Sequence, residues 1–312
     1  MIISASRRTD IPAFYSKWFM NRLKEKFVLV RNPVNRKQIS KIPLSPEFVE
    51  CIVFWTKNPL PLLPELETID QLGYKYYFQF TLTSYNKTIE PNVPKKTILI
   101  DSFKKLSYKI GKEKVIWRYD PILISDVFHY NYHLEWFHYM AEQLSGYTDK
   151  CIISFLDVYK KCERNMKEIA LAKVSQKDRT SLAGELASIS KSFGIVMASC
   201  AEDIDLSSIG ISHGKCIDDS LISKINHRTI EIEKDKNQRD ACGCVKSIDI
   251  GAYNCCKHNC VYCYANYSRN AVESNTVLHD PSSPLIYGCL QGDESISTKK
   301  IESFTQSQLP LF

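Results

Sequence analysis

Three cysteines near the C-terminus, Cys256, Cys260 and Cys263, are spaced as a C-x3-C-x2-C triplet. Three thiolates at this spacing can bind three irons of a 4Fe–4S cube, and the fourth iron is then left without a protein ligand. An iron with a free position can bind and reduce a small molecule instead of only passing electrons. A structural zinc site is the alternative, but zinc sites commonly pair two C-x2-C knuckles, which this uneven spacing fits poorly. The triplet therefore predicts a 4Fe–4S cluster with an open iron.

A second set of four cysteines comprises Cys200, Cys216, Cys242 and Cys244. They could ligate a second 4Fe–4S cluster, which would be fully coordinated by protein and suited to electron transfer or to anchoring a substrate. The alternatives are a zinc site built from the same four thiolates and a mixture of packing thiols and metal ligands. We expect a second metal site here and place the cluster ahead of zinc. Cys255 is left out because two adjacent side chains cannot easily point at one cluster.

Polar residues follow the apolar runs along the first two thirds of the chain. Examples are Lys57-Asn58 and Arg118-Tyr-Asp120, each at the end of a run of apolar residues. Cations on neighbouring strands could hold a carboxylate or a phosphate, although single residues of this kind also simply begin turns. The candidates for substrate or cofactor binding are Arg7, Arg8, Asp10, Lys57, Asn58, Arg118, Asp120 and Glu202. The sequence singles out no catalytic residue.

The apolar runs that must position these residues are typical of strands buried on both faces of a parallel sheet, because apolar residues do not alternate with polar ones within them. Stretches with helical periodicity lie between several of them, most clearly over 178–193. Strands that alternate with helices indicate βαβ units, and seven strands fit a (β/α)8 barrel, complete or partly open. A doubly wound open sheet is the alternative. The predicted strands are 2–5, 27–30, 51–55, 76–80, 115–119, 151–155 and 195–199, with a possible eighth near 215–217.

A change of composition after Ile232 ends the predicted barrel, which takes residues 1–232. Residues 233–270 form a cysteine-rich Fe–S segment that can bury little apolar surface, so we expect metal binding to supply its order. Barrel active sites lie at the carboxyl ends of the strands, and we expect this segment to fold over the barrel mouth. Residues 271–312 form a polar tail that we expect to be partly mobile.

The chain has 312 residues, a formal net charge of +6 and 24% charged residues, which are ordinary values for a globular protein. It contains no run of about 18 apolar residues, which predicts that no helix spans a membrane. The N-terminus lacks the pattern of a signal peptide, and 12 cysteines without such a signal argue against a disulfide scaffold. We therefore expect a cytoplasmic protein. Its mild positive charge permits an anionic partner without requiring one.

Several motifs are distributed along the chain. They are Ile3–Pro12, Phe54–Pro59, Trp117–Pro121, Ser199–Glu202, Cys242-Gly-Cys244, Asp249–Tyr253 and the triplet with the residues around it. Together they resemble an uncharacterised bacterial family, domain of unknown function 1848. The resemblance covers roughly residues 1–270 and names no reaction.

The cluster loop, Cys260-Val-Tyr-Cys263-Tyr-Ala265, resembles that of radical S-adenosylmethionine enzymes, most closely the spore photoproduct lyase branch. This resemblance implies reductive cleavage of S-adenosylmethionine at the open iron to a 5′-deoxyadenosyl radical, which abstracts hydrogen from a substrate. It implies an enzyme of lyase or oxidoreductase type with a low-potential electron donor, flavodoxin- or ferredoxin-like. Asp120 or Glu202 could then bind a ribose hydroxyl or the methionyl amine. In those enzymes the loop usually follows the first strand, whereas here it follows the whole predicted barrel.

The sequence leaves the substrate open among a nucleic acid lesion or base, a peptide and a small anion. The photolyase-type loop favours nucleic acid, but no concentrated basic face of the kind that duplex-binding proteins carry is evident. The alternative from another class is a non-catalytic barrel, stapled by an Fe–S or zinc centre, that binds a ligand or carries electrons.

Overall fold

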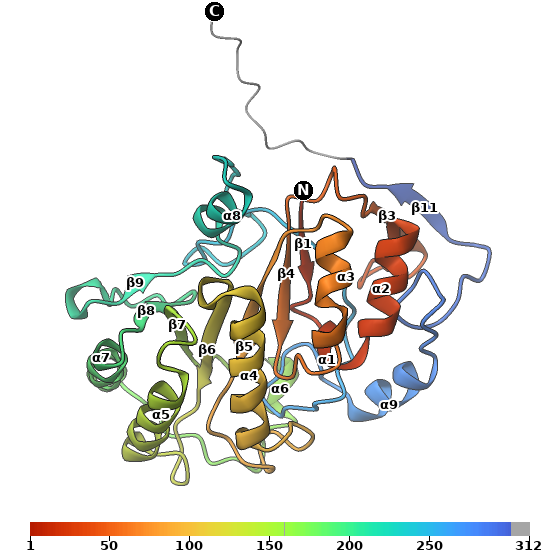
Figure 1. The fold of residues 1–312 in the computed structure, drawn as a ribbon. Helices are drawn as coiled ribbons and strands as arrows, with labels where there is room; N and C mark the ends of the chain where they lie inside the picture. Colours follow the sequence, from red (N-terminus) through yellow and green to blue (C-terminus); the bar gives the residue numbers. More distant parts are fainter. Residues whose placement is uncertain (159, 301–312) are drawn as a thin grey trace, which may run out of the picture.

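A parallel sheet of eight strands forms the centre of the protein, seen in a computed structural model that describes residues 1–158 and 160–300 (Figure 1). The strand order is β10-β1-β4-β5-β6-β7-β8-β9, and every neighbouring pair is parallel. Because all strands run the same way, their carboxyl ends share one edge of the sheet. The strands are β1 (Ile2–Ala5), β4 (Cys51–Thr56), β5 (Tyr76–Thr81), β6 (Val115–Ile122), β7 (Lys150–Phe155), β8 (Val196–Ser199), β9 (Ser212–His213) and β10 (Ile248–Asp249).

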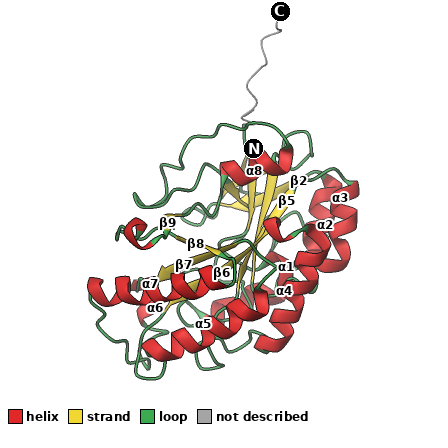
Figure 2. Cartoon of the chain, turned by 60° about the vertical axis from the view of Figure 1, so that its left-hand side comes forward, coloured by secondary structure: helices red, strands yellow, loops and turns green. Residues whose placement is uncertain are grey.

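Helices cover one face of this sheet. Figure 1 shows α2, α3, α4 and α5 in front of the strands, and Figure 2 shows the helical layer from the side. The helices are α1 (Ile11–Phe14), α2 (Ser16–Glu25), α3 (Leu66–Gln71), α4 (Lys96–Ile110), α5 (Tyr130–Leu144), α6 (Lys160–Glu163), α7 (Gln176–Ser192), α8 (Asp219–Asn226) and α9 (Arg269–Val277). Short 3-10 turns lie at Leu63–Glu65, Lys112–Lys114 and Ser207–Ile209. None of these described helices is long and apolar enough to cross a membrane.

Local signals set the ends of the longer helices. At the start of α7, the side chain of Ser175 accepts from the backbone N–H of Asp178, and the carboxylate of Asp178 accepts from that of Ser175. This capping box satisfies backbone donors that the first turn of a helix leaves free. The C-terminal end of α4 is set by Gly111, whose φ of 94° is readily adopted only by glycine.

The strands are buried on both faces, as their uninterrupted apolar sequences predicted. Phe54 and Trp117 pack into the core beneath the helices. Val53 and Ile116, one position earlier on the same strands, point the opposite way into a second core. That second core is completed from the C-terminal half of the chain by Ile217, Ile222 and Val245. Residues after β9, including α8, thus supply the layer on the face opposite α2, α3, α4 and α5.

The chain after β9 reaches the middle of that face. The carbonyl oxygen of Cys216 accepts hydrogen bonds from Tyr77 Oη at 2.7 Å and from Gln79 Nε2 at 2.9 Å. Both donors belong to β5, which is separated from β9 by β6, β7 and β8. The segment after the edge strand therefore crosses the sheet and does not continue outward.

The predicted α/β class with a large parallel sheet is confirmed, whereas a closed barrel is not observed. The hydrogen-bonded ladder begins at β10 and ends at β9, and no pairing joins these two strands within residues 1–158 and 160–300.

Two strand predictions need correction. β2 (Phe27–Arg31) is a strand as expected, but it pairs antiparallel with β3 (Gln38–Pro43), and β11 (Ser295–Thr298) extends this second sheet. The short link between β2 and β3 is the reason, because antiparallel neighbours need only a tight turn whereas parallel neighbours need a crossover. The strand expected near 215–217 is β9, at 212–213, and β10 was not predicted at all.

The C-terminal segments pack closely against the rest of the protein. The cysteine-rich segment contributes β10, in which Asp249 is in register with Ser4 of β1. After α9, the carbonyl oxygen of Ser283 accepts from Trp18 Nε1 of α2 at 2.9 Å. The domain boundaries expected at 232 and 270 stay a prediction. Of the tail that was expected to be partly mobile, residues 301–312 lie outside the described residues.

Candidate metal centre

A cavity of about 770 Å³ lies at the carboxyl edge of the parallel sheet. Loops that follow the strands form its walls together with the cysteine-rich segment. Both predicted thiol sets line it, and so do six of the eight polar candidates. These residues are Cys200, Cys216, Cys242, Cys244, Cys256, Cys260, Cys263, Arg7, Arg8, Asp10, Lys57, Arg118 and Asp120. Residues far apart in the sequence therefore meet in one cavity.

The triplet loop is fastened at this edge by the loop that follows β5. Val261 N donates to the carbonyl oxygen of Ile89 at 3.0 Å, and Asn92 Nδ2 donates to that of Lys257 at 2.8 Å. Within the triplet, Asn259 has a φ of 54°, a left-handed conformation that asparagine adopts more easily than most residues. The C-terminal loop thus lies at the carboxyl ends of the strands even though it follows them all in sequence.

Asp10 joins the first strand end to the triplet loop. Its Oδ1 accepts from Ala13 N at 2.9 Å, which caps α1, and from Thr56 Oγ1 at 2.7 Å. Its Oδ2 accepts from Lys57 N at 2.7 Å and lies 2.9 Å from His258 Nε2. Both carboxylate oxygens are therefore engaged within the protein, and the contacts of Asp10 hold the triplet loop in place.

His258, between the first two cysteines of the triplet, is a candidate that the sequence prediction missed. It is 3% exposed, its Nε2 faces Asp10, and its Nδ1 is buried without a hydrogen-bond partner. A buried polar atom without a partner costs free energy, so Nδ1 has an unused hydrogen-bonding position beside the triplet. The signal that could have revealed His258 is its position inside the triplet.

Glu90 is a second buried hub that the sequence did not reveal, because it lies in a loop and not at a strand end. Its Oε1 accepts from Lys57 Nζ at 2.7 Å, Thr83 Oγ1 at 2.7 Å and Tyr262 Oη at 2.6 Å. Its Oε2 accepts from Lys96 Nζ at 2.6 Å. Burial alone would raise the pKa of Glu90, but the two ammonium groups outweigh it and hold that pKa well below its usual range. Against the effect of burial, Glu90 in turn raises the pKa of Lys57.

Burial raises the pKa of all three triplet thiols, Cys256, Cys260 and Cys263. The ammonium of Lys57 acts in the opposite direction on Cys260 and Cys263. The three thiols influence one another through space, and no hydrogen bond joins them in the described part of the chain. Cys256 and Cys260 are therefore buried, Cys263 is half-buried, and the last two lie within reach of the positive charge of Lys57.

Two thiols of the second set are in direct contact. Cys200 Sγ and Cys216 Sγ are 3.1 Å apart. Interaction with the thiols of Cys216 and Cys242 lowers the pKa of Cys244. Ile217 N also donates to Cys244 Sγ at 3.4 Å. The four thiols that the sequence grouped are therefore together.

Two arginines flank the indole of Trp55 beside this row. The guanidinium groups of Arg7 and Arg118 lie 5.6 and 5.2 Å from the ring centroid. Arg118 donates from Nη2 to Asp120 Oδ2 at 2.5 Å and from Nη1 to Cys216 Sγ at 2.6 Å. Burial would lower the pKa of Arg118, but Asp120 and the neighbouring thiols outweigh it and raise that pKa. Arg118 is therefore a fixed positive charge next to the sulfur atoms.

Asp249 was missed because it ends β10, the strand that the sequence did not predict. Its Oδ2 accepts from Ser4 Oγ at 2.9 Å and from Arg7 N at 2.8 Å, and its Oδ1 accepts from Ser6 Oγ at 2.6 Å. The side chain of Arg8 approaches it to 3.9 Å. Asp249 thus fixes the first strand end and partly neutralises the cations predicted there.

The remaining two candidates, Asn58 and Glu202, are not among the residues that line the cavity. Asn58 Oδ1 accepts from Leu60 N at 3.2 Å, which is the turn geometry that Asn-Pro signals. Glu202 Oε1 accepts from Phe155 N at 2.6 Å, and burial raises the pKa of Glu202 to about 7. These two candidates therefore lie outside the cavity lining, although each is close to a candidate that lines it.

No group of three or more His, Cys, Asp or Glu side chains in residues 1–158 and 160–300 is arranged to hold a metal ion as it stands. The donors are nevertheless of the right chemistry, because thiolates are the ligands that zinc and iron–sulfur clusters take. The buried, unpartnered nitrogen of His258 beside the triplet also fits a site that receives a further group.

The fold and the site define an α/β protein with a thiol-lined cavity at the carboxyl edge of a parallel sheet. Residues 2–265 match the model of the family described as Domain of unknown function (DUF1848), and the chain belongs to that family. The motifs from Ile3 to the triplet had indicated the same family. No curated protein matches the sequence.

Proposed function

We propose that this protein is a radical S-adenosylmethionine enzyme in which Cys256, Cys260 and Cys263 hold a 4Fe–4S cluster. The main support is that the three thiols line the same cavity as the polar strand ends. A volume of about 770 Å³ lies within the range typical of small-molecule sites. When bound, such a cluster supplies the electron that cleaves S-adenosylmethionine, and the 5′-deoxyadenosyl radical removes hydrogen from a substrate.

The residues around the triplet would bind and orient the reactants. Lys57 Nζ directs one of its three donors at Glu90, which leaves donors for a carboxylate. Arg7 can neutralise an anionic group, and the Oδ1 atom of Asp120 can accept from an amine or a hydroxyl. Cys256 and Cys260 are nearly buried, so the loop that carries them would also limit access of water to the reaction.

The proposal includes two further parts. We infer that the sheet is a (β/α)8 barrel opened between β9 and β10, with the cysteine-rich segment over its mouth. The electron would come from a flavodoxin- or ferredoxin-like donor in the cytoplasm.

One observation favours a different function. Charged groups around the cavity are paired with one another, as Arg118 is with Asp120 and Lys57 with Glu90. Internal pairing of this kind also suits a non-catalytic protein in which a metal centre holds the cysteine-rich segment and the cavity binds a ligand.

Anaerobic reconstitution tests the proposed enzyme. Protein treated with iron, sulfide and dithionite is given S-adenosylmethionine, and 5′-deoxyadenosine is measured by mass spectrometry. We expect product from the native protein and none from C256A/C260A/C263A, which lacks the ligands of the open-iron cluster. Cys151→Ala is the matched control, because Cys151 is also buried but packs in the core beneath the helices.

A native protein that shows a complete cluster spectrum and forms no 5′-deoxyadenosine would overturn the proposal. Zinc without acid-labile sulfide at the triplet would favour the non-catalytic alternative, if C256A/C260A/C263A loses that zinc.

A further inference from the structure

Two thiols of the second set are already close together, because Cys200 Sγ and Cys216 Sγ are 3.1 Å apart. Cys242 and Cys244 line the same cavity and pack with Cys216 in the second core. Ligands of a single ion crowd around one point, whereas ligands of a cluster stand on separate irons. The contact between Cys200 and Cys216 therefore favours a single ion for this set.

We propose that Cys200, Cys216, Cys242 and Cys244 form a four-coordinate zinc site that is separate from the triplet. Zinc binds four thiolates tetrahedrally with bonds of about 2.3 Å, which places the sulfur atoms about 3.8 Å from one another. The observed contact of 3.1 Å needs only a small opening to reach that spacing. A 4Fe–4S cube would need a much larger separation of the same side chains.

The four thiols are not arranged around one point as the chain stands. Cys216 Sγ contacts Cys200 Sγ, and Cys244 Sγ accepts a hydrogen bond from the backbone N–H of Ile217, the residue after Cys216. Zinc takes its cysteine ligands as thiolates, so binding releases any protons that they hold, and rotation of the side chains can gather the sulfur atoms around the ion.

The surroundings carry the charge that this centre requires. A zinc ion with four thiolates has a net charge of −2, which is costly in a buried site unless it is compensated. Arg118 Nη1 lies 2.6 Å from Cys216 Sγ, and Arg7 interacts electrostatically with Cys244 and Cys216. Ile217 N donates to Cys244 Sγ. Two cations and a backbone donor thus support the thiolates, as outer groups do around metal ligands generally.

The position of the four cysteines assigns the zinc a structural role. Cys200 follows β8, Cys216 follows β9, and Cys242 and Cys244 precede β10. A site closed by four thiolates leaves no position for a reactant and instead contributes to folding. The zinc would join the two edges of the sheet through their loops and hold the start of the cysteine-rich segment against the second core. This inference does not depend on the chemistry proposed for the triplet.

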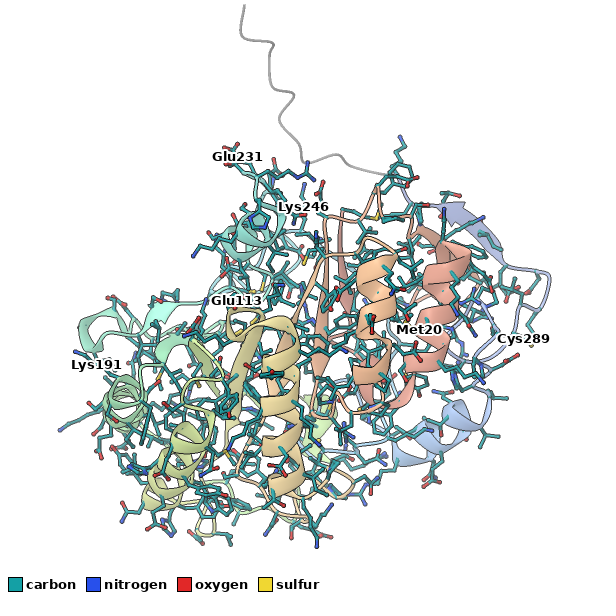
Figure 3. All side chains as sticks on the ribbon, in the orientation of Figure 1. Met20, Glu113, Lys191, Glu231, Lys246 and Cys289 are labelled. Atoms are coloured by element: carbon teal, nitrogen blue, oxygen red, sulfur yellow. The ribbon has the colours of Figure 1, made fainter. Side chains whose placement is uncertain are left out.

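Metal analysis of the whole protein tests the assignment. We expect about one zinc per chain in the native protein and at least a tenfold lower zinc content in C216A/C244A. C256A/C260A/C263A should keep its zinc, because the triplet belongs to the other centre. Cys289→Ala, on the outer loop between α9 and β11 (Figure 3), is the control for loss of an exposed thiol and should also keep it.

A second measurement covers the possibility that C216A/C244A does not fold. Cobalt replaces zinc in the native protein, and we expect the intense sulfur-to-cobalt charge-transfer bands of a tetrathiolate, weakened in the single variant Cys200→Ala. Zinc unchanged in C216A/C244A would overturn the proposal, as would iron with acid-labile sulfide retained in C256A/C260A/C263A. Native protein purified without oxygen that holds a disulfide between Cys200 and Cys216 and no zinc would overturn it too.

Discussion

Most charged side chains around the cavity form an ion pair with a partner of opposite charge. This pairing limits how strongly each one can bind a charged ligand. Arg118 is tied to Asp120, and Lys57 is tied to Glu90. Glu202 differs from these, because its main contact is the backbone N–H of Phe155 and burial raises its pKa to about 7. A carboxyl group of this kind makes the stability of the protein depend on pH near neutrality.

Replacing Glu202 by glutamine should stabilise the protein above pH 7. The folded-state pKa of about 7 exceeds the value of about 4.3 for a free glutamate, so the folded protein holds an extra proton between these values. Stability therefore falls as pH rises through this window. Glutamine keeps an oxygen for Phe155 N without the charge. We expect the free energy of unfolding in urea to rise by about 1–3 kcal/mol at pH 8 and to change little at pH 4.

Glu142→Gln, on the exposed side of α5, is the control and should be nearly neutral at both pH values. An equal gain for Glu202→Gln at pH 4 and pH 8 would show that the charge of Glu202 is not the cause.

Glu90 connects elements rather than single residues. Its carboxylate joins the loop after β5 to Lys57 after β4, to Lys96 at the start of α4 and to Tyr262 in the triplet loop. The triplet loop is thereby attached to the sheet through a buried group of charges.

Replacing Glu90 by glutamine should destabilise the protein by about 3–5 kcal/mol, because two buried ammonium groups lose their partner. Tyr262→Phe removes a single hydrogen bond to the same carboxylate and should cost about 1 kcal/mol. Urea unfolding at pH 7 gives both values, and hydrogen exchange of residues 256–263 should become faster in Glu90→Gln. Equal effects of the two variants would contradict the assignment of Glu90 as a charge hub.

The elements show where prediction from sequence works and where it stops. The apolar runs of β1 and β4 to β8 were recognised because burial on both faces leaves a local signal. The partner of a strand is not local, so β2 was placed in the wrong sheet. β10 has two residues and no periodicity, and it is a strand only through its pairing with β1, in which Asp249 is in register with Ser4. The same holds for the site: the spacing of the cysteines, and His258 within it, can be read from the sequence, whereas Glu90 is important only through contacts that folding creates.

At the scale of the whole molecule, the formal charge of +6 does not gather at the cavity. Lys57 and Arg118 each form an ion pair there, and Arg8 lies near Asp249. The cavity, at about 770 Å³, has the size of a small-molecule site and suits a small ligand better than a duplex.

We therefore expect duplex DNA to bind weakly, with an affinity that changes less than about tenfold between 50 and 200 mM salt. A protein that neutralises 6–10 phosphates would lose about 10³–10⁵ in affinity over that range. The cations of the cavity are neutralised by acidic partners, so few positive charges remain to contact a phosphate backbone. Fluorescence anisotropy with a labelled duplex measures the affinity for native protein, for Arg8→Glu and for Lys24→Glu, which reverses an exposed charge on α2. An affinity that falls steeply with salt, and that Arg8→Glu lowers further while Lys24→Glu does not, would instead place a nucleic acid at the cavity mouth. Weak binding that both variants leave unchanged would favour a peptide or a small anion as the substrate.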